Sequence, residues 1–209
     1  MDQFPIEPAV LAPFLFAVLL IELTPGPNMG YLAALSASQG RVAGFKAVFG
    51  ITLGLAFYML LAVAGVAEII AAAPLVYGLL RWAGVAYLLY LAWEAWRGAR
   101  ETSPGHAEET NQAPFWRGLI ANVLNPKALV FYVALLPGFI APEHAAFWVQ
   151  ALILGSLHIV ISFIVHAAIV VGASHAGALI AKSQHAVVVR QALALGIALI
   201  AAWLAWETR

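Results

Sequence analysis

The sequence predicts an all-α fold: a polytopic membrane protein with six transmembrane helices, arranged as two inverted three-helix repeats. Three observations lead to this prediction: an apolar composition, six long apolar segments, and a proline motif in the middle of the first segment of each half. Of the 209 residues, 64% are hydrophobic and 10% are charged, whereas a soluble domain carries about 25% charged residues. A chain of this length cannot bury so many apolar side chains inside itself, so we expect many of them to face lipid.

Six segments are apolar over roughly 20 residues, the length that a helix needs to cross a bilayer. They are residues 9–38, 43–67, 74–96, 115–140, 145–173 and 187–206. We expect the first to be retained as a span and not cleaved as a signal peptide, because the residues before it are acidic. The chain then divides into a first three-helix half, 1–96, a connecting loop, 97–114, and a second three-helix half, 115–209, within one integral membrane domain.

The basic residues predict the orientation, since cytoplasmic loops of membrane proteins carry an excess of lysine and arginine. Seven of the ten basic residues lie beside the first, third and fifth connections: Arg41, Lys46, Arg97, Arg100, Arg117, Lys182 and Arg190. We therefore expect both termini outside the cytoplasm and the loop 97–114 inside it.

The composition also excludes several kinds of partner. The net charge is zero, which leaves no basic surface for a nucleic acid. There is no cysteine, so the chain has neither disulfides nor thiolate ligands, and no two histidines near mid-membrane depth have the spacing of metal ligands on a helix. We expect no metal site and no cofactor.

The first apolar segment is interrupted at its middle by the sequence Thr24-Pro25-Gly26-Pro27-Asn28. The two prolines have no N–H to donate to the preceding helical turn, and the glycine adds backbone freedom. Each proline also disfavours helical geometry in the residue before it. We therefore expect helix breaks at Pro25 and Pro27.

The fourth segment has a matching interruption at its own midpoint, in Asn125-Pro126-Lys127. Backbone groups that a break sets free cost several kcal/mol in lipid unless protein or water satisfies them, so such breaks are found where they line a cavity. Many secondary transporters bind substrate at the midplane between two broken helices. The candidate substrate-binding residues come from the two motifs and one asparagine beside them: Thr24, Gly26, Asn28, Asn122, Asn125 and Lys127.

Two residues of opposite charge lie at mid-membrane depth, Glu22 before the first break and Lys127 in the second. Such a position is costly and points to function. One interpretation is a static ion pair that joins the halves. The other gives them separate tasks: Lys127 balances the carboxylate of a substrate, and Glu22 carries a proton. His158, at the midpoint of the fifth segment, can relay protons or can be a neutral hydrogen-bonded core residue.

These motifs resemble those of the lysine exporter family of amino-acid translocators (the LysE/RhtB type), and the resemblance covers nearly the whole chain. It rests on six blocks in order, residues 23–29, 39–44, 83–88, 115–119, 124–128 and 136–139. Gly138 departs from the family pattern, since many members have glutamine there. Gly50 and Gly54 also fit the pattern, and we interpret their spacing as close helix packing, with lining of the substrate path as the alternative.

The resemblance implies a secondary active exporter of amino acids or close derivatives in the bacterial inner membrane, driven by proton antiport. Its partners would be the amino acid, protons and membrane lipid, and a homodimer is compatible with the sequence. Two other functions are conceivable for a membrane protein of this size. A small membrane enzyme acting on lipid or isoprenoid head groups would need an acidic or histidine cluster at one interface, which the sequence lacks. A pure assembly partner would have no cavity for broken helices to line.

Overall fold

The computed structural model describes residues 4–65, 73–98, 112–180 and 186–207, and within these ranges all regular structure is helical. The elements, in chain order, are α1 (Pro8–Leu23), α2 (Pro27–Val63), α4 (Pro74–Gly98), α5 (Ala113–Val123), α6 (Pro126–Val130), the π-helical turn η2 (Phe131–Leu135), the 3-10 turn η3 (Leu136–Phe139), α7 (Phe147–Ile180) and α8 (Ala186–Glu207). The all-α prediction is confirmed for this part of the chain. Most of the expected connecting loop, residues 99–111, lies outside the described residues, as do Arg100 and Lys182.

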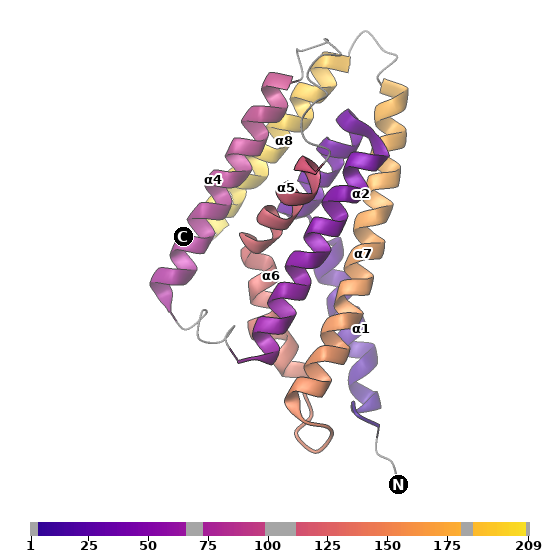
Figure 1. Ribbon diagram of the computed structural model, residues 1–209, viewed down its shortest axis with the longest axis vertical. Coiled ribbons are helices and arrows are strands. Elements are labelled where there is room, and N and C mark those ends of the chain that lie inside the picture. Colours follow the sequence, from indigo (N-terminus) through magenta and orange to yellow (C-terminus); the bar gives the residue numbers. More distant parts are fainter. Residues whose placement is uncertain (1–3, 66–72, 99–111, 181–185, 208–209) are drawn as a thin grey trace.

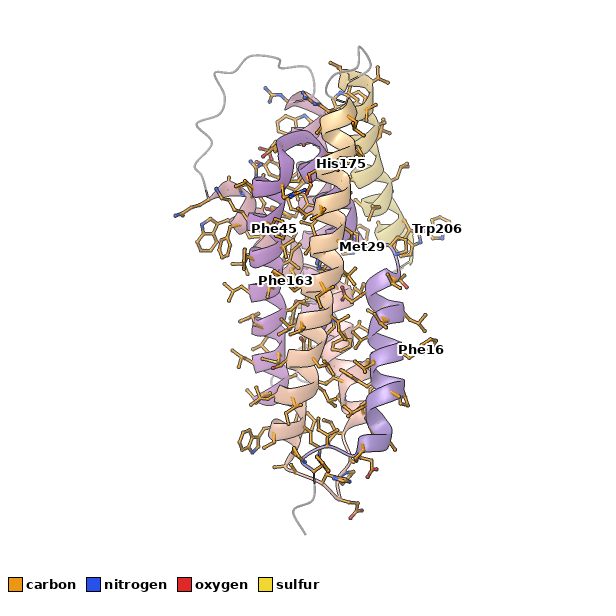
Figure 2. The ribbon with its side chains drawn as sticks, turned by 90° about the vertical axis from the view of Figure 1, so that its right-hand side faces the viewer. Phe16, Met29, Phe45, Phe163, His175 and Trp206 are labelled. Carbon is orange, nitrogen blue, oxygen red and sulfur yellow. The ribbon has the colours of Figure 1, made fainter. Side chains whose placement is uncertain are left out.

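By length and composition, three of the described helices can cross a membrane: Pro27–Val63, Pro74–Arg97 and Phe147–Leu179. A fourth span results if Ala113–Val123 and Pro126–Phe139, which are bent by 53° at their junction, are counted together. Pro8–Leu23 and Val187–Trp203 are shorter apolar helices. Large apolar side chains such as Phe16 and Trp206 point outward from the ribbon (Figure 2), with exposed fractions of 64% and 73%. A surface of this kind suits lipid.

Helix α2 is bent sharply at Gly40, which has a φ of 84°. Residues with a side chain rarely adopt this backbone conformation, so a glycine is needed there. Both views show the chain turning back on itself at this point (Figures 1 and 2), and a Cβ atom on Gly44 would lie 2.3 Å from the hydroxyl of Ser36. The bend therefore separates residues 27–39 from residues 41–63, close to the boundary that the sequence predicts between the first two apolar segments.

The second part of α2 packs between α5 and α7 through small residues. A Cβ atom on Gly50 would lie 2.0 Å from the carbonyl oxygen of Phe115, and one on Gly118 would lie 2.3 Å from that of Ala47. On the α7 side, Gly155 lies against Met59. Because glycine has no side chain, the helix backbones can approach closely at these positions. This agrees with the packing interpretation of Gly50. Helices α4 and α8 pack against each other beside this group (Figure 1).

Residues before α1 are tied to the turn between η3 and α7 by His144. Its Nδ1 lies 3.0 Å from the carbonyl oxygen of Phe4, and its Nε2 lies 2.6 Å from Oε2 of Glu7. A carbonyl and a carboxylate only accept hydrogen bonds, so both ring nitrogens donate when the imidazole is protonated. The hydrogen bond to the Phe4 carbonyl and then that to Glu7 raise the pKa of His144 above its ordinary value of 6.5, and the charge of Glu143 adds to this.

We expect the His144 contact to make stability depend on pH. A raised pKa in the folded state means that the stabilisation is complete below about pH 6.5, the ordinary value, and is lost as the pH rises through the raised value. The melting temperature of the purified protein should therefore fall as the pH rises above about 6.5, and His144→Gln should flatten this dependence. His175→Gln, at an exposed position near the far end of α7 (Figure 2), is the matched control. A His144→Gln protein with the wild-type pH dependence would contradict this assignment.

Candidate functional site

Both proline motifs coincide with helix ends. Helix α1 ends at Leu23, Thr24 is extended (φ −68°, ψ 121°), and α2 begins at Pro27 after an extended Gly26. Proline suits the first position of a helix, where an N–H would have no intrahelical partner. The break exposes the last carbonyls of α1 and the first N–H groups of α2 at the same level of the molecule.

The second break has the same form. Helix α5 ends at Val123, and α6 begins at Pro126, again with proline at its first turn. Asn125 is the N-cap residue, and its side-chain oxygen accepts the backbone N–H of Lys127 at 3.0 Å. This capping satisfies one of the N–H groups that a helix start leaves free.

A small cavity lies between the two breaks and the middle of α7. Seven of the residues singled out from the sequence line it: Glu22, Gly26, Asn28, Asn122, Asn125, Lys127 and His158. Its remaining lining is apolar or hydroxylic, from Ile21, Met29, Leu55, Ala128, Phe131, Ser162 and the further histidine His166. Its free volume is about 30 Å³, which is room for a few water molecules. Neither Thr24 nor any of the three break prolines, Pro25, Pro27 and Pro126, is part of the lining.

Lys127 binds the broken end of α1. Its Nζ donates to the carbonyl oxygens of Ile21, at 2.5 Å, and Thr24, at 2.9 Å. In a continuous helix the Ile21 carbonyl would accept the N–H of residue 25, which proline lacks. Here the Ile21 carbonyl accepts the Thr24 N–H, at 3.2 Å, and also the ammonium group from the second half of the chain, at the helix end where the dipole favours a cation. The hydroxyl of Thr24 is exposed and donates to the Leu20 carbonyl, so Thr24 contributes its backbone here.

Glu22 is paired with His158 and not with Lys127. Its Oε1 lies 3.1 Å from Nε2 of His158, and Nδ1 of the same ring lies 3.1 Å from the hydroxyl of Tyr132. Glu22, His158 and Tyr132 are all buried, with exposed fractions of 7%, 1% and 0%. The ion pair expected between Glu22 and Lys127 is therefore replaced by two separate sets of contacts, although both residues line one cavity.

Two asparagines connect the two breaks directly. Nδ2 of Asn28, in the first turn of α2, donates to Oδ1 of Asn122 near the end of α5, at 2.8 Å. Both side chains are buried. This hydrogen bond leaves Oδ1 of Asn28 and Nδ2 of Asn122 without a hydrogen-bond partner among the described residues. A Cβ atom on Gly54 would lie 2.6 Å from that Nδ2, so the glycine makes room for the Asn122 amide.

Tyr132 and Ser162 are not among the site residues predicted from the sequence. Tyr132 lies in an apolar aromatic run, where nothing in the sequence separates it from an ordinary core residue. A signal for Ser162 was present: His158, Ser162 and His166 are four residues apart, and side chains at this spacing share one helix face. The hydroxyl of Ser162 lies 3.1 Å from Nδ1 of His166, so α7 presents a polar line of three side chains to the cavity.

Comparison with known proteins gives a consistent result. The family model described as LysE type translocator matches residues 19–208. An uncharacterised membrane protein of Pseudomonas aeruginosa is 36% identical over 152 residues, covering 68% of this chain and 70% of the relative. The leucine efflux protein of Salmonella typhimurium is 37% identical over 131 residues, which is 61% of each chain. No solved structure matches the chain.

Proposed function

Because the chain belongs to the LysE type translocator family, and is thus a membrane transporter and not an enzyme, we propose that it exports a neutral amino acid or a close derivative from the cytoplasm by proton antiport. The observation that carries this proposal is the cavity between the two broken helices, which brings Glu22 from the first half beside Lys127 and Asn122 from the second. This arrangement supports a substrate site at the midplane, as in other transporters with broken helices.

The lining of the cavity fits a zwitterion with an apolar side chain. The ammonium of Lys127 suits the substrate carboxylate as a charge-assisted hydrogen bond. The side-chain oxygen of Asn28, which has no hydrogen-bond partner among the described residues, suits the substrate amino group. The walls formed by Ile21, Leu55 and Phe131 suit an aliphatic side chain. One relative is a leucine efflux protein, which favours leucine or a similar residue as the substrate here. A volume of about 30 Å³ is too small for an amino acid, so the helices must separate for binding.

Two inverted three-helix repeats account for the arrangement of the helices. In this proposal the first half comprises α1 with residues 27–39, then residues 41–63, then α4. The second comprises α5 with α6 and its two turns, then α7, then α8. Corresponding elements pair: the broken helices meet at the cavity, residues 41–63 pack on α7, and α4 packs on α8. This arrangement implies six spans, with the loop 97–114 in the cytoplasm and both termini outside it. Arg41 and Lys46 fit this orientation, because they lie just after the Gly40 bend, at the opposite end from the N-terminus (Figure 1).

Purified protein in liposomes tests this function. Vesicles are preloaded with labelled leucine, threonine, lysine or glutamate, and a proton gradient is imposed that drives protons inward. We expect leucine to leave fastest, and a protonophore to remove the acceleration. Vesicles without protein are the control. If none of the amino acids leaves faster than from empty vesicles, with or without the gradient, the proposed function is wrong.

A further inference from the structure

We propose that Tyr132 is a positioning residue for proton coupling, which holds the imidazole of His158 in the tautomer whose Nε2–H faces Glu22. The inference rests on the proposed proton antiport and assigns a task to a residue outside the cavity lining. Tyr132 reaches Glu22 only through His158, so it acts on the proton site and not on the substrate.

The hydrogen-bond geometry determines the tautomer. A neutral imidazole has one N–H donor and one nitrogen acceptor. The Glu22 carboxylate, 3.1 Å from Nε2, can only accept, so Nε2 carries the hydrogen. Nδ1 is then the acceptor, and the hydroxyl of Tyr132, 3.1 Å away, donates to it. The hydrogen bond that Nδ1 accepts therefore determines that Nε2 carries the hydrogen and donates it to Glu22.

The π-helical turn η2 places two consecutive aromatic rings around this imidazole. The ring of Phe131 stacks on it at a centroid distance of 3.7 Å and an interplanar angle of 27°, and the ring of Tyr132 meets it edge-on at 5.4 Å. Single π-helical turns are common at functional sites. Since Phe131 covers the face of the ring and Tyr132 holds its Nδ1, rotation of the imidazole away from Glu22 is restricted.

The surroundings of Glu22 make this orientation important. The ionisable side chains near it are His158, His166 and Lys127, all of which line the same cavity. Lys127 donates hydrogen bonds to the carbonyls at the end of α1, and Nδ1 of His166 is hydrogen-bonded to the hydroxyl of Ser162. His158 therefore supplies a direct hydrogen bond, beside one from Ser162, that stabilises the Glu22 carboxylate after its proton has left for water. Without the Tyr132 hydroxyl, the other tautomer would turn a nitrogen lone pair toward Glu22, which is tolerated only while Glu22 keeps its proton.

The test is Tyr132→Phe in the liposome assay. Loss of one oriented hydrogen bond corresponds to a fall of about tenfold in the maximal rate of gradient-driven export. We expect the KM for the amino acid to change less than about twofold on the same scale, because Tyr132 does not line the cavity. The dependence of rate on pH should change, whereas exchange of labelled for unlabelled amino acid, which moves no net proton, should continue.

Tyr58→Phe is the matched control. Its hydroxyl donates to the carbonyl of Val123 at 2.5 Å, so the variant loses the same group from a buried tyrosine that does not bond His158. We expect it to keep the wild-type pH dependence. In a His158→Gln background, Tyr132→Phe should have no further effect on the gradient-driven rate.

Three results would overturn the inference: a Tyr132→Phe protein with wild-type rate and pH dependence, an equal change in Tyr58→Phe, or an additive effect in the His158→Gln background. If Tyr132→Phe does not fold, fluorotyrosine at position 132 replaces it in the test, because this residue keeps the ring and the hydroxyl and changes only the acidity of the donor. An unaltered dependence of rate on pH would then contradict the inference. Absence of all transport by the wild-type protein would instead refute the proposed function.

Discussion

Glu22→Gln should abolish gradient-driven export while it leaves exchange of labelled for unlabelled amino acid in place. The amide cannot take up or release a proton, but it can still accept a hydrogen bond from His158 in the geometry observed for Glu22. Removing a proton-transfer group typically costs 10² to 10⁴ in rate, so we expect gradient-driven export to fall at least about 100-fold. The measurement compares both activities in the same liposome preparation.

Glu143→Gln is the control for this variant, since Glu143 lies exposed in the turn before α7 and does not line the cavity. It should behave like the wild type in both assays. If Glu22→Gln still exports leucine against a gradient in proportion to the imposed pH difference, Glu22 is not the proton carrier.

Lys127→Met should lower both substrate affinity and stability. The variant removes a charged donor from two carbonyls at the end of α1. Because Thr24 is exposed and the Ile21 carbonyl keeps the Thr24 N–H, we expect the loss of stability to be about 1 kcal/mol. It also removes the cation proposed to bind the substrate carboxylate, which predicts a rise in KM of roughly 10- to 100-fold, corresponding to about 1.4–3 kcal/mol. The melting temperature and the KM for leucine are the two measurements.

Lys46→Met, outside the cavity lining, makes the same chemical change as a control. Combining Glu22→Gln with Lys127→Met distinguishes the two interpretations of the charges. A static ion pair predicts that the double variant recovers the stability lost by each single variant. The structure gives the two residues different hydrogen-bond partners, although both line one cavity. We therefore expect the double variant to recover only part of the stability that the single variants lose, and full recovery would contradict this.

Much of the fold could be predicted because it follows from local chemistry. Proline lacks an N–H wherever it stands, so the ends of α1 and α5 could be located without any knowledge of the tertiary structure. The bend at Gly40 lies in the short gap between the first two apolar segments. Asn28, Asn122 and Asn125 could be selected as a group because they adjoin the breaks.

Which side chains pair could not be predicted in the same way. Opposite charge favoured Glu22 with Lys127, but pairing depends on the depth and rotation of α7 relative to α1, which no local pattern contains. The packed structure brings His158 to Glu22, and Lys127 donates hydrogen bonds to the carbonyls of Ile21 and Thr24 and not to Glu22. Tyr132 was missed for a related reason: its importance comes from its contact with a histidine 26 positions away.

The bond from Lys127 to the end of α1 also bears on how the protein is made. The carbonyl of Ile21 accepts the nearby Thr24 N–H, but its second donor, the Lys127 ammonium, is 106 residues later in the chain, so the N-terminal half emerges from the ribosome without the cation at this helix end. Until the second half enters the bilayer, water must take the place of that ammonium at the broken end of α1. The two halves would then mature together and not in sequence, and a fragment ending before Lys127 would be a natural target for membrane quality-control proteases.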